Sequence, residues 1–191
     1  FMPTLFLLSW GIPFLTEAHG ISRSTAGLMN GNLFLGFACG APVYGVISDK
    51  YNNRFALLYV ANIMTFMLTF MYIFMPIGTS SYIFALLIFL IGAFSSGFII
   101  AFAIAKDMNP LRLAGTTSGF VNTINQSLGA AATNIAPMLL DRFGQKTVLE
   151  TGEVIYDVAS YQASLSLIPV GLVLGLIALT ITHYLWIKQN S

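Results

Sequence analysis

The stretch "GVISDKYNNR", residues 45–54, is a short polar segment between two long apolar runs. Of the 191 residues, 57% are hydrophobic and only 8% are charged, and the mean hydropathy is +0.81. Soluble domains carry about a quarter charged residues. The composition therefore predicts an all-α protein of the lipid bilayer, in which "GVISDKYNNR" connects two membrane-spanning helices.

Apolar runs of about 20 residues, the length that an α-helix needs to cross the hydrocarbon, predict six transmembrane helices. Their expected bounds are about 1–15, 24–47, 55–75, 82–105, 115–140 and 160–187. Residues 141–159 form the expected outer loop, and "KTVLETGEVIY" within it suits either a small hairpin or a disordered loop. The chain starts without the basic segment or cleavage site of a signal peptide, so we expect it to begin inside a helix of something longer.

The basic residues predict the orientation. If the first helix enters from the cytoplasm, five of the eight Lys and Arg residues lie on the inner side. These are Lys50, Arg54, Lys106, Arg112 and Lys188, against Arg23, Arg142 and Lys146 outside. We therefore expect an integral protein of a bacterial inner (plasma) membrane with both chain ends cytoplasmic.

Composition also argues against several classes of site and partner. A net charge of +1 gives no reason to expect a nucleic-acid partner, and one cysteine, Cys39, allows neither an intrachain disulfide nor a Cys-based metal site. No cofactor or metal is expected. No Asp, Glu, Lys or Arg lies mid-span, so the chain offers no obvious proton relay or ion-coupling site.

Amides mark the expected substrate cavity, because an unpaired polar group in hydrocarbon costs several kcal/mol. The fifth span places Asn122, Asn125 and Gln126 on neighbouring helical stripes. Asn30 lies in the second span, and Trp10 lies beside a Gly and near a Pro in the first. These five residues are the candidates for a wet cavity. Interhelical hydrogen bonding, and simple packing for Trp10, are the alternatives.

Glycines recur every four or five residues in the second span, at Gly27, Gly31, Gly36, Gly40 and Gly45. Small residues at this spacing allow another backbone to approach closely, so the first four are expected to serve helix packing rather than binding.

"GVISDKYNNR" resembles the signature Gly-x-Leu-Ala-Asp-Arg-x-Gly-Arg-Arg/Lys of the major facilitator superfamily, which lies between the second and third helices of each six-helix half. Gly45, Asp49 and Arg54 match, whereas Asn52 and Asn53 replace a Gly and a base. The weakened signature and the short tail "WIKQNS" suggest the C-terminal half of a twelve-helix fold, built from two three-helix repeats.

The resemblance implies a gating loop of Gly45, Asp49, Lys50 and Arg54. Asp49 would cap a helix of the opposite half, with Lys50 and Arg54 bracing it, although a solvated turn is the simpler alternative. It also implies that the first, second, fourth and fifth helices face the cavity, and that the third and sixth lie outside. The expected partners are an N-terminal six-helix half of the same full-length chain, the bilayer and a small polar solute.

The function that this implies is secondary active transport by alternating access, as symport or antiport, and not enzymatic catalysis. A six-helix membrane scaffold or assembly partner is the alternative. An intramembrane serine hydrolase would need Ser95 or Ser96 and His183 at one depth, whereas Ser96 is expected mid-span and His183 near a helix end.

Overall fold

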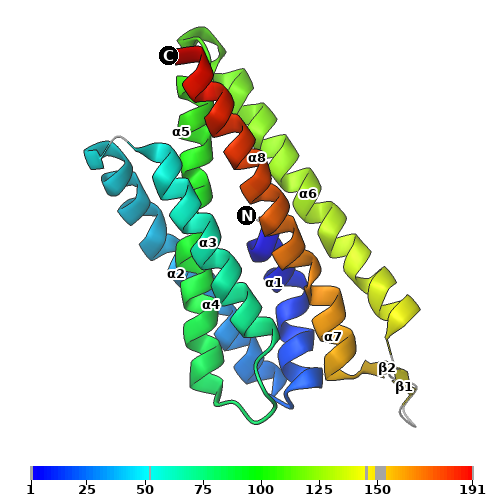
Figure 1. Ribbon diagram of the computed structural model, residues 1–191. Coiled ribbons are helices and arrows are strands. Elements are labelled where there is room, and N and C mark those ends of the chain that lie inside the picture. The colour runs from blue at the N-terminus through cyan, green and yellow to red at the C-terminus, as the bar shows by residue number, and fades with distance from the viewer. Residues whose placement is uncertain (1, 52, 145, 149–153, 191) are drawn as a thin grey trace.

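The computed structural model of the protein describes residues 2–51, 53–144, 146–148 and 154–190 (Figure 1). It is a bundle of helices with one two-stranded hairpin at one end. The elements in chain order are α1 (Met2–Pro13), the π-helical turn η1 (Phe14–Ala18), α2 (Arg23–Tyr51), α3 (Arg54–Ile73), α4 (Ser81–Ser95), the 3-10 turn η2 (Ser96–Phe98), α5 (Ile99–Asp107), the 3-10 turn η3 (Leu111–Leu113), α6 (Ala114–Phe143), β1 (Lys146–Val148), β2 (Val154–Tyr156), α7 (Val158–Leu165) and α8 (Leu167–Asn190).

Four of the described helical segments are long and apolar enough to cross a membrane. They are α2, α3, the segment Ser81–Asp107 that contains α4 and α5, and the segment Val158–Lys188 that contains α7 and α8. These segments confirm the prediction of a helical membrane protein. The crossings expected of α1 and α6 stay predictions, because α1 has 12 residues, about 18 Å of helix, and α6 is long but rich in amides.

Glycines bring α2 and α4 into close contact. A Cβ added at Gly36 would overlap the carbonyl oxygen of Phe89, and one added at Gly40 would overlap that of Ala93. Gly92 of α4 lies equally close to the backbone of α2. The absence of side chains at these positions lets the two backbones touch, which is the packing that the glycine spacing predicted for Gly36 and Gly40.

Gly27 and Gly31 correct the prediction of one packing stripe, because a Cβ added at either would meet no described atom within 4 Å. Nine residues separate Gly27 from Gly36, which is about two and a half helical turns. The two glycine pairs therefore lie on opposite faces of α2, and of these four glycines only Gly36 and Gly40 pack against described residues.

Aromatic side chains close the hairpin end of the bundle. The ring of Phe14 packs at 5.2 Å from that of Tyr72 and at 5.9 Å from that of Tyr161, measured between centroids. Phe84 completes this cluster, and all four side chains are buried. The core thus joins η1, α3, α4 and α7 at one end, where most of the large buried side chains of the chain collect.

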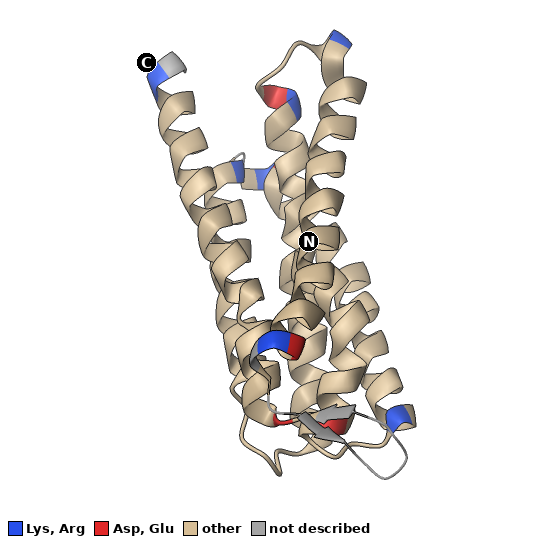
Figure 2. Ribbon diagram, turned by 90° about the vertical axis from the view of Figure 1, so that its right-hand side faces the viewer, with Lys and Arg blue, Asp and Glu red and all other residues tan. Residues whose placement is uncertain are grey.

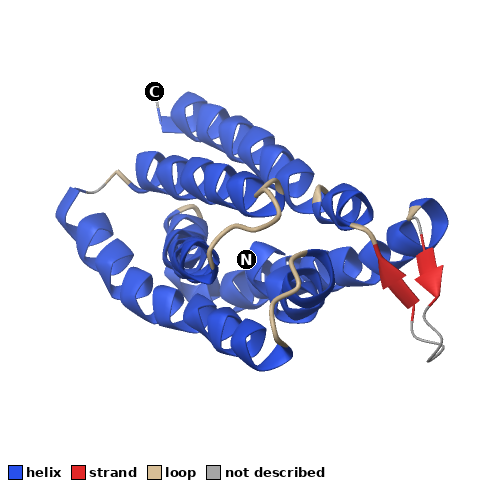
Figure 3. Cartoon of the chain, turned by 90° about the horizontal axis from the view of Figure 1, so that it is seen from below, coloured by secondary structure: helices blue, strands red, loops and turns tan. Residues whose placement is uncertain are grey.

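The hairpin lies at the edge of the helices when the bundle is seen from below (Figure 3). β1 and β2 pair antiparallel, with Thr147 opposite Ile155, where the sequence allowed either a hairpin or disorder. The intervening residues 149–153 lie outside the described residues. Two tyrosines anchor this region, because the Tyr156 hydroxyl donates to Asp141 at 2.6 Å and the Tyr161 hydroxyl donates to Glu17 at 2.7 Å.

Candidate functional site

The polar segment 45–54 is formed mainly by two helix ends. α2 continues through Asp49 and Lys50 to Tyr51, and Asn53 caps the start of α3, its side-chain oxygen accepting from the Ala56 N–H at 3.2 Å. The backbone of Asn53 has φ of −113°, so this Asn serves as a helix cap and not as a left-handed turn residue. Asn52 lies outside the described residues.

Arg54 forms an ion pair with Asp107, which joins the start of α3 to the end of α5. The expectation that Arg54 braces Asp49 is therefore wrong. Among the described residues Lys50 forms no ion pair with Asp49 either, and its Nζ lies 5.5 Å from the ring centroid of Tyr51. Among the described residues Asp49 has no ion-pair partner, and its side chain is exposed.

Helix dipoles explain why Arg54 and Asp107 pair. A cation is disfavoured at a helix N-terminus and an anion at a C-terminus, and these two residues occupy those unfavourable ends of α3 and α5. The ion pair brings Arg54 to the negative end of the α5 dipole and Asp107 to the positive end of the α3 dipole, so each charge is stabilised by the other helix. Gly45, the first residue of the signature, is exposed, and a Cβ there would meet no described atom within 4 Å.

Trp10 links α1 to α6 at a proline. Pro137 has no N–H, so the carbonyl of Thr133, four residues earlier, loses its hydrogen bond within α6. The indole Nε1 of Trp10 donates to this carbonyl oxygen at 3.3 Å. One turn before, Gly129 lies against the side chain of Leu5, which brings the two helices together. Trp10 thus satisfies a backbone group that the sequence of α6 leaves unpaired.

Asn30 is the buried amide of the candidate site. Its side chain is 6% exposed and lies against α1, where a Cβ on Gly11 would come within 2.7 Å of its Oδ1 atom. This oxygen accepts no hydrogen bond from any described residue. A buried amide oxygen without a donor calls for water or a ligand group, because burial without a partner costs about 1–3 kcal/mol.

The amides of α6 differ from Asn30 in being open. Asn122 and Gln126 are exposed and Asn125 is half-buried, whereas Gly129 and Thr133 of the same stripe lie against α1. The stripe therefore divides into a packed half near the hairpin and an open polar half toward η3.

A hollow of about 650 Å³ runs along the free face of α1 and η1, and its polar lining was not predicted from the sequence. Ser9 and Thr16, seven residues apart on one helix face, line it together with Glu17 and Arg23. This i, i+7 spacing was the available signal. None of the five predicted cavity residues lines this hollow.

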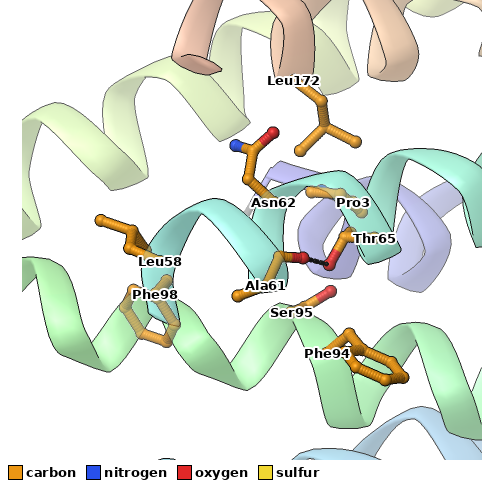
Figure 4. Close-up of a pocket in the computed structure, with 9 residues that line it drawn as sticks. All are labelled: Pro3, Leu58, Ala61, Asn62, Thr65, Phe94, Ser95, Phe98 and Leu172. Atoms are coloured by element: carbon orange, nitrogen blue, oxygen red, sulfur yellow. Dashed lines mark hydrogen bonds between the residues drawn. The ribbon is translucent and has the colours of Figure 1, made fainter. Parts of the chain in front are cut away.

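A second, smaller cavity of about 60 Å³ lies inside the bundle (Figure 4). Asn62 and Thr65 of α3 and Ser95 of α4 line it, with Pro3 and Leu172 beside them. The Thr65 hydroxyl donates to the Ala61 carbonyl at 2.7 Å, so its lone pairs remain able to accept from water. A volume of this size holds about two water molecules.

The family model of the Major Facilitator Superfamily matches residues 2–188. The chain belongs to this superfamily. No curated protein matches the chain. Members of the superfamily are membrane transporters, so the apolar helices of this superfamily chain belong in a membrane.

The hydrolase alternative has no geometric basis in this superfamily chain. The hydroxyls of Ser95 and Ser96 donate to the carbonyls of Ile91 and Ala93 in their own segment, at 2.5 and 2.7 Å. The ring of His183 instead stacks on that of Phe55, 4.4 Å away between centroids.

Titratable groups gather at the hairpin end of the superfamily chain, outside its membrane-spanning segments. His19 lies edge-on to Phe14 and Phe84, with centroid distances of 4.9 and 4.6 Å, and burial lowers the pKa of its imidazole. Tyr156 has its pKa raised to about 12, first by its hydrogen bond to Asp141 and then by partial burial and the charges of Asp141 and Glu17. Both shifts favour the neutral form and reflect how the hairpin end is packed.

Proposed function

We propose that the chain is one six-helix half of a secondary active transporter that moves a small polar solute by alternating access. The observation that carries this proposal is the open polar surface of a chain that belongs to a transporter family. Asn122 and Gln126 are exposed on α6, and Ser9 and Thr16 line a hollow on α1. Exposed amides in a helix between apolar segments need water, a ligand or a second half.

The other side of the bundle suits lipid. α3 and α8 lie side by side, joined by the hydrogen bond from the Tyr59 hydroxyl to the Thr180 hydroxyl at 3.2 Å. Their exposed side chains are mainly apolar, for example Val60, Met67 and Ile177. This supports the arrangement in which the third and sixth spans lie outside and the polar faces meet a partner half.

Asp49 is proposed as the contact of this half with the other on the cytoplasmic side. Its carboxylate is exposed and without an ion-pair partner among the described residues, which leaves it available to cap a helix N-terminus. The basic residues support an orientation with this end in the cytoplasm of a bacterial cell, since five of the eight Lys and Arg residues belong to this side, and Figure 2 shows the others nearer the hairpin. Coupling by symport or antiport belongs to the same proposal.

The test uses the full-length transporter and a screen of small polar solutes for uptake into proteoliposomes. Once a transported solute is found, Asp49→Asn should reduce the uptake rate without reducing the yield of folded protein. Asn122→Ala and Gln126→Ala should raise KM for that solute, while Asn134→Ala is the matched control, because that amide donates to the Ala130 carbonyl of its own helix at 2.8 Å. Uptake unchanged in the three test variants would refute these roles.

A further inference from the structure

A cavity of about 340 Å³ lies where three helices end, at the opposite end of the bundle from the hairpin. The start of α3, the end of α5 and the last turns of α8 enclose it. Arg54, Asp107 and His183 provide polar walls, and Phe55 and Ile104, both nearly buried, provide an apolar floor. This cavity is separate from the hollow on α1 and from the amides of α6.

The guanidinium of Arg54 is only partly used. Its Nη1 donates to Asp107, whereas its Nε is buried and has no acceptor among the described residues. An arginine offers five N–H donors in a planar fork that suits a carboxylate or a phosphate. The Arg54 side chain as a whole is 26% exposed, so it remains accessible to a ligand that brings acceptor oxygens.

The walls of the cavity are held in place before any ligand arrives. His183 stacks on Phe55 with the ring planes 12° apart, and the hydroxyl of Tyr59 donates to Thr180 one turn further along α8. These contacts fix α8 against α3. A preformed site loses less entropy on binding than one that must be assembled.

The charge at this end of the bundle is positive. Of the residues that the sequence assigns to this side, five are basic and only Asp49 and Asp107 are acidic. Positive surface charge concentrates anions nearby, and phosphate groups pair with arginine more strongly than neutral groups do.

We propose that this cavity binds the anionic phosphate of a phosphate ester, with Arg54 as its main donor. The ester is either the headgroup of a membrane phospholipid or a soluble organophosphate. Trp186 and Ile187 of α8 line the same cavity, and Leu185 and Ile181 beside them are exposed and apolar. Tryptophan is enriched at membrane interfaces. These side chains of α8 therefore favour a phospholipid whose acyl chains lie along α8.

Binding is measured by isothermal titration calorimetry on the purified full-length transporter in a zwitterionic detergent. The two probes are short-chain phosphatidylglycerol and its deacylated form, glycerophosphoglycerol, which carry the same singly charged phosphodiester and differ in the acyl chains. Arg54→Gln should weaken binding about tenfold or more, the effect of losing one charge-assisted hydrogen bond.

Because Arg54→Gln also breaks the ion pair with Asp107, a second variant leaves that pair intact. Ile187→Glu adds a carboxylate to the cavity wall and should weaken binding by at least about tenfold through repulsion. Leu185→Glu is the matched control, since Leu185 is 49% exposed and Ile187 54% exposed, and Leu185 does not line the cavity.

One supporting result is that only phosphatidylglycerol binds, and that its binding is lost in Ile187→Glu and kept in Leu185→Glu. This result would identify a membrane lipid as the ligand of the cavity. Equal, Arg54-dependent binding of glycerophosphoglycerol supports the site and identifies a soluble phosphate ester as its ligand. No binding of either probe, unchanged binding in Arg54→Gln and Ile187→Glu, or equal losses in Ile187→Glu and Leu185→Glu would overturn the proposal. None of these measurements depends on transport.

Discussion

Replacing Trp10 by Phe tests whether the indole N–H stabilises the carbonyl that Pro137 leaves unpaired. The substitution keeps an aromatic ring at the joint of α1 and α6 and removes the donor that lies 3.3 Å from the Thr133 oxygen. In a Pro137→Ala background the new Ala N–H can bond the same carbonyl within α6. The indole donor should then become dispensable.

The coupling between the two substitutions measures this bond. Interhelical hydrogen bonds in membrane proteins contribute about 0.6 kcal/mol on average and up to about 1.7 kcal/mol. Pro137 removes the usual i+4 donor of the Thr133 carbonyl, so we expect a coupling near the upper end, about 1–1.7 kcal/mol. Trp10→Phe alone should cost this amount plus the packing lost with the larger ring.

The assay is reversible unfolding of the purified protein in mixed micelles, with the free energy of unfolding measured for the parent, both single variants and the double variant. Pro42→Ala in α2 is the control, because the Trp10 indole donates to Thr133 and not to the carbonyl of Ala38 that Pro42 frees. It should add to Trp10→Phe without coupling. A coupling between Trp10 and Pro137 below about 0.3–0.5 kcal/mol, the usual limit of additivity, would refute the reasoning.

Three further predictions use the same stability measurement. Gly36→Ala should destabilise the protein by about 1–3 kcal/mol because its Cβ meets the backbone of α4, whereas Gly175→Ala, whose Cβ would lie 3.5 Å from Asn62, should change stability by less than about 1 kcal/mol; equal effects would contradict the contact. Asp107→Asn should lower the free energy of unfolding by less than about 1 kcal/mol, because the side chains of the Arg54–Asp107 pair are 26% and 49% exposed. The double variant Arg54→Gln/Asp107→Asn should lose less stability than the sum of the two single losses. Because burial lowers the pKa of His19 below 6.5, the unfolded chain binds more protons, so stability should fall as pH drops below about 6.5, and His19→Phe should flatten this dependence.

The fold class followed from apolar run length because hydrocarbon leaves a chain few choices besides helices. The amides of α6 could also be singled out, since polar side chains in a helix flanked by apolar segments stand out at single positions. Their surroundings could not be predicted. Whether Asn30 is buried against Gly11 or Asn122 lies open depends on which helix packs on which, and one sequence does not contain that information.

The contacts that sequence reasoning missed are long-range. Arg54 pairs with a carboxylate 53 positions away, and Trp10 donates to a carbonyl 123 positions away. The resemblance to the superfamily signature implied that Arg54 braces Asp49, and the two lie in one short segment of the sequence. The structure places them on different helices and brings the ends of α3 and α5 together instead. The sequence shows that Pro137 lacks an N–H donor. It does not show that the indole N–H of Trp10 takes the place of that donor.

The glycines of α2 show how one spacing can serve two contacts. Steps of four residues keep a glycine near the same face, whereas the steps of five, from Gly31 to Gly36 and from Gly40 to Gly45, carry it round the helix. Gly36 and Gly40 therefore meet α4, and Gly31 and Gly45 share the opposite face, which no described atom covers at those positions. Asp49 lies one turn beyond Gly45 on this same face, exposed and without an ion-pair partner among the described residues. A helix with one face packed on its own bundle, and a second, exposed face that contains Gly31 and Gly45 and ends at Asp49, fits the contact between two halves that we propose.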